Sequence, residues 1–352
     1  MPDLFSTYEL KGKTIKNRLV FPPCVCFSYA DNDGFVSERN IAHYEAIAKG
    51  GTGLIVVEAT AINKNGRLHH MQLGMWDDKH IDGMAKLTEK IHEYGAVALL
   101  QIHHAGMKTI SDGETSSENI FTASDYDIGE GKIVRGATLE EIEQVIADFE
   151  SAALRAHKAG FDGVEIHGAH DYLLSQFLSV DVNKRADEYG KNRLLLHLKI
   201  VKAIKSKLPE SFITALRLGA NDDSMADGIE YAKALEAAGV DLLNISSGHS
   251  RKQPDDMESF GGYHWVCQLG MNIHKHVSIP TICVFGIRTP EAADEIIKSE
   301  LCDFVAVAKG LLSDPNWINK YEKSEAIVPC AECKRCFYYT DGIGCPGRAK
   351  CR

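Results

Sequence analysis

The segment EIHGAHDYLLSQFLS, which begins at Glu165, places three side chains that could do chemistry close together. His167 and His170 are three residues apart, and Tyr172 follows two residues later, at the predicted end of a strand. Imidazole N–H groups can stabilise an oxygen on which negative charge develops, and a phenol can deliver a proton. A lone histidine at a strand end is more often structural, but this grouping is typical of a reactive site. What this group of side chains can do depends on the strands and helices that position it.

Composition narrows the class of protein. The chain has 352 residues, of which 44% are hydrophobic and 25% charged, as in a globular protein with a large core. The net charge is −10 and the lysines are scattered, so neither nucleic acid nor an anionic membrane is a predicted partner. No apolar run approaches the ~18–20 residues of a membrane span, and the start MPDLFSTYELKGKTIKNRL lacks a signal-peptide pattern. We therefore expect a cytoplasmic protein.

Strand and helix patterns alternate along the chain. Continuous apolar runs such as GLIVVE and DFVAVA are typical of parallel strands covered on both faces. Amphipathic stretches such as HIDGMAKLTEKIHEYG lie between them and end at a glycine, a common helix terminator. We expect eight strands: Leu19–Phe21, Gly53–Glu58, Val97–Gln101, Gly163–His167, Phe212–Leu218, Asp241–Ser246, Thr281–Val284 and Phe304–Ala308. Eight such units predict a (β/α)₈ TIM barrel, because the glycine-rich turn of a doubly wound sheet is missing after the first strand.

In such a barrel the chemistry lies at the carboxyl ends of the strands. The residues predicted there are polar and poor in carboxylates, which disfavours a glycosidase or a carboxylate metal site. Gly286, Lys309 and Gly310 follow the last two strands, where barrels often bind a phosphate group. A phosphorylated cofactor is therefore plausible.

Six motifs, in order along the chain, resemble the old yellow enzyme family of FMN-dependent oxidoreductases. They are KNRLVFPP, GLIVVEATAI, LLQIHHAGMK, DGVEIHGAHDYLLSQFLS, ADEYG and GLLSDP, and the resemblance extends from about Leu4 to Trp317. It implies a barrel that holds FMN noncovalently and takes electrons from NADH or NADPH. The implied reaction transfers hydride from flavin N5 to the β-carbon of an α,β-unsaturated carbonyl compound, as in an ene-reductase.

The resemblance also implies roles for individual residues. His167 and His170 match the pair that binds the substrate carbonyl oxygen, and Tyr172 matches the proton donor. The implied flavin-binding residues are Pro23, Val25, Ala59, Gln101, Arg217, Gly286, Lys309 and Gly310.

Four departures from the family pattern affect this transfer of roles. Lys309 stands where the family usually has arginine. A phosphate would therefore be bound by a single ammonium group rather than by a planar guanidinium that can donate two parallel hydrogen bonds. Val25 replaces a threonine or cysteine that touches the flavin in many relatives, which leaves the flavin potential open. Asp171 replaces the usual glycine after the second histidine. The sequence KNRLLL after ADEYG is shorter than usual, which predicts a rebuilt loop.

A cysteine-rich tail, residues 326–352, follows the predicted barrel domain of residues 1–325. Five of the ten cysteines lie in the last 23 residues, and Cys330, Cys333, Cys336 and Cys345 have the spacing C-x₂-C-x₂-C-x₈-C. Such a cluster in a reducing compartment indicates metal binding or redox chemistry more than disulfides. The sequence is consistent with a [4Fe–4S] cluster, as in the dienoyl-CoA and enoate reductases, with zinc, or with metal-free thiols.

Alternative functions remain open at this level. One is an iron–sulfur flavoprotein related to the enoate or dienoyl-CoA reductases or to the amine dehydrogenases, which would take electrons from a partner protein. Another is a flavin redox sensor whose tail changes state. We also expect a homo-oligomer. The motifs identify neither the physiological substrate nor the preferred nicotinamide.

Overall fold

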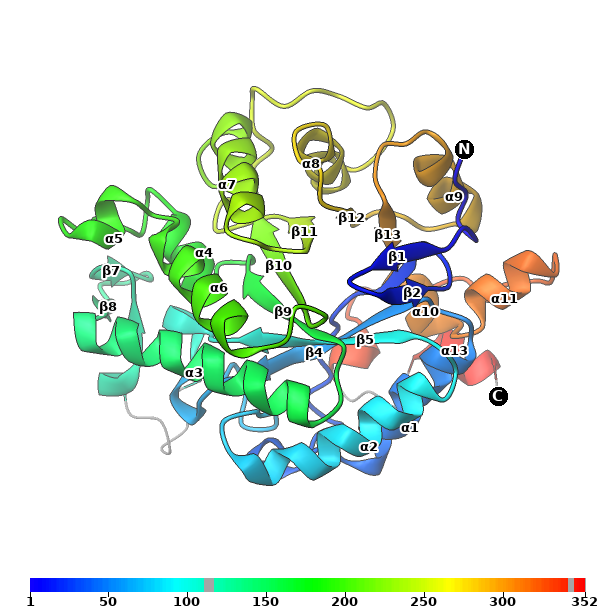
Figure 1. The fold of residues 1–352 in the computed structure, drawn as a ribbon, viewed down its shortest axis with the longest axis horizontal. Coiled ribbons are helices and arrows are strands. Elements are labelled where there is room, and N and C mark those ends of the chain that lie inside the picture. The colour runs from blue at the N-terminus through cyan, green and yellow to red at the C-terminus, as the bar shows by residue number, and fades with distance from the viewer. Residues whose placement is uncertain (111–116, 341–344, 352) are drawn as a thin grey trace.

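The computed structural model is a closed barrel of eight parallel strands, and it describes residues 1–110, 117–340 and 345–351. Neighbouring strands pair in the order β10-β11-β12-β13-β3-β4-β5-β9 around the barrel (Figure 1). The last strand pairs with the first through Val305 against Leu19 and Ala306 against Val20. The predicted TIM-barrel fold is confirmed.

All eight predicted strands are present; β3 and β12 have the predicted bounds, and the other six have shifted ends. They are β3 (Leu19–Phe21), β4 (Leu54–Ala61), β5 (Val97–His103), β9 (Gly163–Gly168), β10 (Ile213–Gly219), β11 (Leu242–Ser246), β12 (Thr281–Val284) and β13 (Phe304–Ala306). Strand β13 ends two residues earlier than predicted, because Ala308 already has helical backbone angles and leads into α10. Strand β4 is longer, since its pairing with β5 resumes after a register shift between Val57 and Thr60.

Helices surround the barrel and follow its strands. They are α1 (Glu38–Lys49), α2 (Ile81–His92), α3 (Leu139–Lys158), α4 (Leu173–Leu178), α5 (Glu188–Lys191), α6 (Leu195–Lys207), α7 (Met225–Ala237), α8 (Trp265–His274), α9 (Pro290–Lys298), α10 (Lys309–Ser313), α11 (Trp317–Glu322), α12 (Phe337–Thr340) and α13 (Pro346–Lys350). Helix α3 begins with a capping box in which the Thr138 hydroxyl accepts from the Glu141 backbone N–H, and the Glu141 side chain accepts from the Thr138 backbone N–H. Gly160 follows it with φ +84°, a conformation that glycine adopts at little cost.

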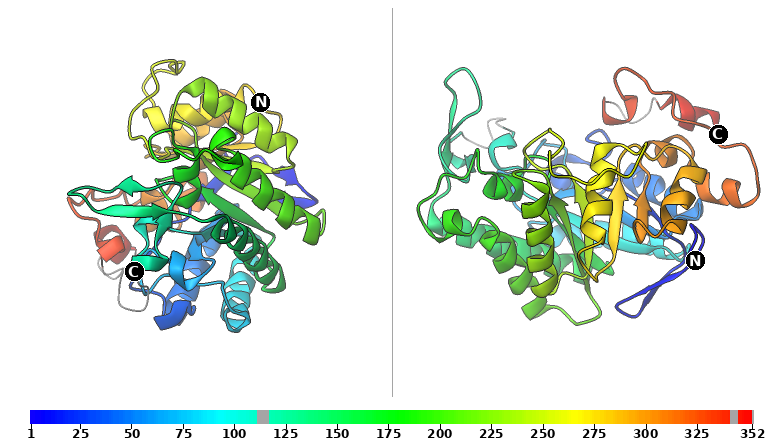
Figure 2. Two further views of the ribbon diagram at one scale, coloured as in Figure 1. Left: turned by 90° about the vertical axis from the view of Figure 1, so that its left-hand side faces the viewer. Right: turned by 90° about the horizontal axis from the view of Figure 1, so that it is seen from above.

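Apolar side chains form two cores. The smaller core fills the barrel interior, where Val20, Val56 and Leu99 from three strands are inaccessible to solvent. The N-terminal hairpin of β1 (Tyr8–Leu10) and β2 (Lys13–Ile15) adds Leu10 and Ile15 to this core and closes one end of the barrel. The larger core lies between the strands and the helices. Figure 2 (right) shows the hairpin at one end of the barrel and the C-terminal segment at the other.

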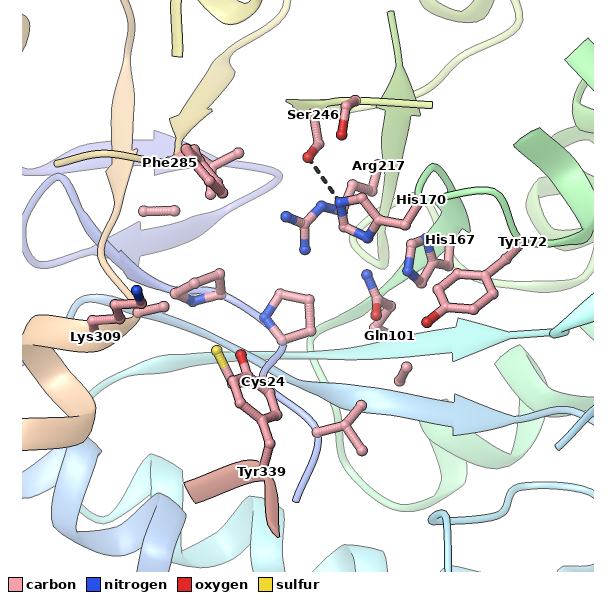
Figure 3. Close-up of a pocket in the computed structure, with 18 of the residues that line it drawn as sticks. Cys24, Gln101, His167, His170, Tyr172, Arg217, Ser246, Phe285, Lys309 and Tyr339 are labelled. Carbon is pink, nitrogen blue, oxygen red and sulfur yellow. Dashed lines mark hydrogen bonds between the residues drawn. The ribbon is translucent and has the colours of Figure 1, made fainter. Parts of the chain in front are cut away.

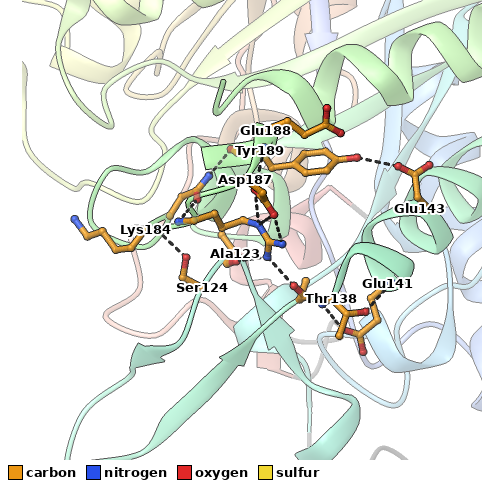
Figure 4. A network of polar contacts seen from close by, with 12 residues as sticks. Ala123, Ser124, Thr138, Glu141, Glu143, Lys184, Asp187, Glu188 and Tyr189 are labelled. Atoms are coloured by element: carbon orange, nitrogen blue, oxygen red, sulfur yellow. Dashed lines mark hydrogen bonds and ion pairs between the residues drawn. The ribbon is translucent and has the colours of Figure 1, made fainter. Parts of the chain in front are cut away.

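Two segments near the open end pack on each other. A small sheet, β6 (Phe121–Thr122), β8 (Ile133–Gly136) and β7 (Tyr126–Asp127), lies in the connection from β5 to α3, where no strand was predicted. The ADEYG segment docks against this region (Figure 4), because Arg185 donates to Ala123 O at 2.9 Å and to Ala137 O at 2.6 Å. Arg185 also pairs with Asp187, which caps α5. This polar network fixes the wall of the barrel beside α4.

No helix in the described part of the chain is long and apolar enough to cross a membrane.

Candidate active site

A cavity of about 500 Å³ opens at the carboxyl ends of the barrel strands (Figure 3). Ten of the predicted site residues line it: Pro23, Val25, Ala59, Gln101, His167, His170, Tyr172, Arg217, Gly286 and Lys309. They come from seven strands or the turns that follow them. The structure therefore gathers into one place residues that are almost 300 positions apart in the chain.

The two histidines point into this cavity as neutral rings. Burial lowers the pKa of both imidazoles well below the usual value, and neighbouring positive groups lower it further. Nδ1 of His167 accepts a hydrogen bond from the Ala169 backbone N–H at 3.4 Å, which places the ring proton on Nε2. Nε2 of His170 lies 2.8 Å from the Ser246 hydroxyl. If that hydroxyl donates, the His170 proton is on Nδ1, and each ring has one N–H to offer a ligand.

Tyr172 is held by two imidazole rings. The ring of His103 meets it edge to face at 4.5 Å and 89°, and the ring of His167 does so at 5.1 Å. Burial raises the pKa of the Tyr172 phenol, and the neighbouring Asp171 carboxylate raises it further. The phenol therefore keeps its proton at neutral pH. His104 accepts from the Gly106 backbone N–H at 3.1 Å.

A buried carboxylate orients the polar groups at the bottom of the cavity. Glu165 accepts hydrogen bonds from Gln101 Nε2 and from Asn244 Nδ2, both at 2.7 Å. Arg217 is only 6% exposed, and Glu165 partly offsets the cost of burying its charge. Nε of Arg217 is buried and has no hydrogen-bond partner among the described residues. An unpaired buried donor beside Gln101 fits a ligand with hydrogen-bond acceptors, such as the pyrimidine edge of a flavin.

The loop after β3 forms one wall. Pro23, Cys24 and Val25 line the cavity, and the Glu58 carboxylate holds the loop by accepting from the Cys26 backbone N–H at 3.0 Å. Burial raises the pKa of Glu58 to about 8 and that of the Cys24 thiol to about 12. Cys24 is thus a protonated thiol.

The opposite end of the cavity has the features of a phosphate site. Gly286 has φ +77°, and a Cβ there would lie 2.8 Å from Cβ of His264, so the turn after β12 requires glycine. Lys309 and Arg288 line the same end. Gly310 is not part of this lining, but with Lys309 it lines a neighbouring cavity, so its predicted contact with a phosphate stays a prediction.

The four tail cysteines predicted as metal ligands are not gathered into one group among the described residues. Within the described ranges, no three His, Cys, Asp or Glu side chains lie close enough together to hold a metal ion. Cys330, Cys333, Cys336 and Cys345 are partly exposed and free of disulfides. The residues as arranged do not fit a preformed cluster or zinc site, so metal binding at the tail stays a prediction.

Sequence reasoning missed several residues of the site. Tyr339 from the tail lines the cavity, as do Phe285 and Arg288. Glu165 and His103 do not line the cavity but contact residues that do: Glu165 accepts from Gln101, and the His103 ring packs against Tyr172. Glu165 could have been found, since a charged residue inside an apolar strand needs a partner. Nothing in the local pattern around Tyr339 indicates that the tail returns to the barrel.

Comparisons with known proteins agree with this geometry. The model of the NADH:flavin oxidoreductase / NADH oxidase family matches residues 3–326. The chain is 38% identical over 320 residues to an NADPH dehydrogenase of Halalkalibacterium halodurans, covering 89% of this chain and 92% of that protein. It is also 38% identical over 359 residues to an NADH oxidase of Thermoanaerobacter brockii, covering 98% of this chain. It spans only 54% of the length of that oxidase.

Solved structures share the fold. An old yellow enzyme homologue from Zymomonas mobilis superimposes with a TM-score of 0.78 at 24% identity, covering 97% of this chain and 100% of the other. A 2-naphthoyl-CoA reductase superimposes with a TM-score of 0.86, also at 24% identity, covering 97% of this chain and 56% of that one.

Proposed function

Because the chain belongs to the NADH:flavin oxidoreductase / NADH oxidase family, to which the old yellow enzymes belong, we propose that it is an FMN-dependent ene-reductase. Its proposed substrate is a small α,β-unsaturated carbonyl compound, and its reductant is NADH or NADPH. The observation that carries this proposal is the convergence of His167, His170 and Tyr172 on one cavity with Gln101 and Arg217. The family implies a flavin and a nicotinamide; the alkene substrate is the proposal.

The cavity fits FMN at both of its polar ends. Gln101 and Arg217 would bind the pyrimidine edge, where Arg217 Nε, unpaired within the described ranges, needs an acceptor. Lys309 and the backbone around Gly286 would hold the phosphate at the other end. When bound, FMN supplies the redox chemistry, carrying hydride from NAD(P)H to the β-carbon of the activated alkene.

The two histidines would bind the substrate carbonyl. Negative charge develops on that oxygen as hydride adds to the alkene, so preset N–H donors stabilise the transition state more than the ground state. Nε2–H of His167 is oriented by the Ala169 contact, and the Ser246 hydroxyl orients His170. Because both rings are neutral, they polarise the carbonyl without needing a proton from solvent.

Tyr172 would deliver the proton to the α-carbon. A phenol whose pKa is raised still protonates an enolate-like carbon, which is the stronger base. The edge contact with His103 fixes the ring, so the hydroxyl needs little reorganisation when substrate binds. Alkenes without a conjugated electron-withdrawing group should not react.

Two half-reactions, measured separately, test the proposal. The purified protein should bind FMN, lose its flavin absorbance with NADH or NADPH without oxygen, and regain it with an enone. Tyr172→Phe should slow reoxidation by the enone about 100-fold or more, because a general acid typically contributes that much. Its reduction by the nicotinamide should be unchanged.

Asn119→Ala, which alters a position outside the cavity lining, serves as the matched control and should behave as the unaltered protein. Normal enone turnover by Tyr172→Phe would remove Tyr172 as the proton donor. A protein that reacts only with oxygen would favour an oxidase or a redox sensor. A partner protein for electron transfer would be required only if neither nicotinamide reduces the flavin.

A further inference from the structure

The tail is fixed over the phosphate end of the cavity. The Ser313 hydroxyl in α10 donates to Pro329 O at 3.0 Å, and the Cys351 thiol donates to Ser313 O at 3.4 Å. Glu332 of the tail forms an ion pair with Arg288, which lines the cavity. Both ends of the tail are thus tied to the elements that follow β12 and β13.

A second set of contacts ties the tail to the loop after β3. Tyr338 is 3% exposed, and its hydroxyl donates to Cys24 O at 2.9 Å. In return, the Cys26 thiol donates to Tyr338 O at 3.1 Å. Reciprocal bonds between a buried tyrosine and a loop that lines the cavity show that the tail is packed on the barrel at this point.

The next residue, Tyr339, enters the cavity. Its side chain lies beside Cys24 in Figure 3, and the residue is 47% exposed and lines the cavity. In Figure 3 Tyr339 lies on the same side of the cavity as Cys24 and Lys309, away from Tyr172. The tail therefore supplies an aromatic wall remote from the catalytic tyrosine.

We propose that the tail is a wall of the flavin site and that Tyr339 packs against the apolar part of the flavin ring. This inference rests on the proposed FMN site. Gln101 and Arg217 offer polar partners at one end, and Lys309 offers charge to the phosphate. The dimethylbenzene part of the ring system is apolar, and the Tyr339 ring covers apolar surface there that would otherwise face water. FMN affinity then depends on a segment beyond the residues that match the family model.

Three full-length variants test this inference through FMN binding. Titration of each apoprotein, followed by flavin fluorescence, gives a Kd. Tyr339→Ala should raise the Kd about five-fold, since aromatic contacts contribute about that much. Tyr339→Phe keeps the ring and should stay within about two-fold. Phe337→Ala, from the same short helix but outside the cavity lining, should leave the Kd unchanged.

Thermal unfolding without FMN distinguishes the loss of a contact between the Tyr339 ring and FMN from the loss of the packing of the tail on the barrel. All three variants should melt at the temperature of the unaltered protein, so that a changed Kd reports on the flavin. If Tyr339→Ala does not fold, Tyr339→Leu replaces it and should raise the Kd in the same direction.

Three results would count against the inference, and a fourth would count against the function on which it rests. A Kd unchanged in Tyr339→Ala would overturn it, and so would equal losses in Tyr339→Ala and Phe337→Ala. A loss in Tyr339→Phe as large as in Tyr339→Ala would assign the effect to the hydroxyl and overturn ring packing. Failure of the unaltered protein to bind FMN would instead overturn the proposed function itself.

Discussion

A single turn brings the residues of the substrate site together. His170 and Asp171 both have left-handed backbone angles, with φ of +62° and +63°, a conformation that is strained for residues other than glycine. The Asp171 carboxylate lies 2.5 Å from His249 Nδ1 and 2.8 Å from Lys108 Nζ. These partners hold a turn that the family usually builds with glycine, and so they position His170 and Tyr172.

Asp171→Asn tests this positioning. Asparagine tolerates the left-handed turn but does not pair with two cations, so we expect enone reduction to slow about ten-fold. Flavin reduction by the nicotinamide should be unchanged. Stopped-flow measurement of both half-reactions checks this, with Asp171→Gly as the second variant. Equal rates in Asp171→Asn and the unaltered protein would show that the charge pairing is dispensable.

The contact between Asp171 and His249 predicts that enone reduction depends on pH. The hydrogen bond to Asp171 raises the pKa of His249 above its usual value. The stabilisation of the turn is therefore complete below the unfolded pKa of about 6.5 and is lost as the pH rises through the folded pKa. Enone reduction by the unaltered protein should fall over that window. The inflection should be absent from the profile of Asp171→Asn; its persistence there would assign it to another group.

At the scale of secondary-structure elements, Glu58 of β4 holds the loop after β3 in place. Its carboxylate accepts from the Cys26 backbone N–H and lies 3.3 Å from the Tyr44 hydroxyl. Burial raises its pKa from 4.5 to about 8. A proton bound more tightly in the folded state stabilises the fold fully below about pH 4.5, and this contribution is lost as the pH rises through about 8.

Glu58→Gln should flatten this dependence. The amide oxygen can still accept from Cys26, but nothing at this position ionises. The free energy of unfolding of the unaltered protein should decline between pH 5 and 9 by on the order of a few kcal/mol more than that of Glu58→Gln. Urea unfolding at several pH values measures this, with Glu89→Gln on the exposed face of α2 as control. Parallel curves for Glu58→Gln and the unaltered protein would contradict the assignment.

Secondary structure was predictable where the pattern was long and apolar. The eight barrel strands are buried on both faces, so runs such as GLIVVE identified them. The sheet of β6, β7 and β8 was missed because its strands have only two to four residues, too short for a periodic signal. The ends of β4 and β13 depend on a register shift and on a following helix, which are tertiary features.

The closed barrel explains why most of the cavity was predictable and part was not. Strand ends of a barrel meet on one face, so Pro23, Gln101 and Arg217 could be assigned to one site from the chain order. The placement of Tyr339 depends on the docking of the tail through Tyr338 and Glu332, which no strand pattern specifies.

At the scale of the whole molecule, the cavity is lined by residues that follow both the first and the last strand of the barrel. A ligand that binds there should therefore stabilise the entire fold. Pro23 follows the first barrel strand and Lys309 follows the last, and those two strands pair to close the barrel. FMN at 100 times its Kd should add about 2.7 kcal/mol to the free energy of unfolding.

Riboflavin, which lacks the phosphate, should stabilise less at the same concentration, because Lys309 and the turn at Gly286 then have no anion to bind. Differential scanning fluorimetry with each ligand tests this, and Lys309→Ala should narrow the difference between them. Equal stabilisation of the unaltered protein by riboflavin and FMN would show that the phosphate is not bound at this end of the cavity.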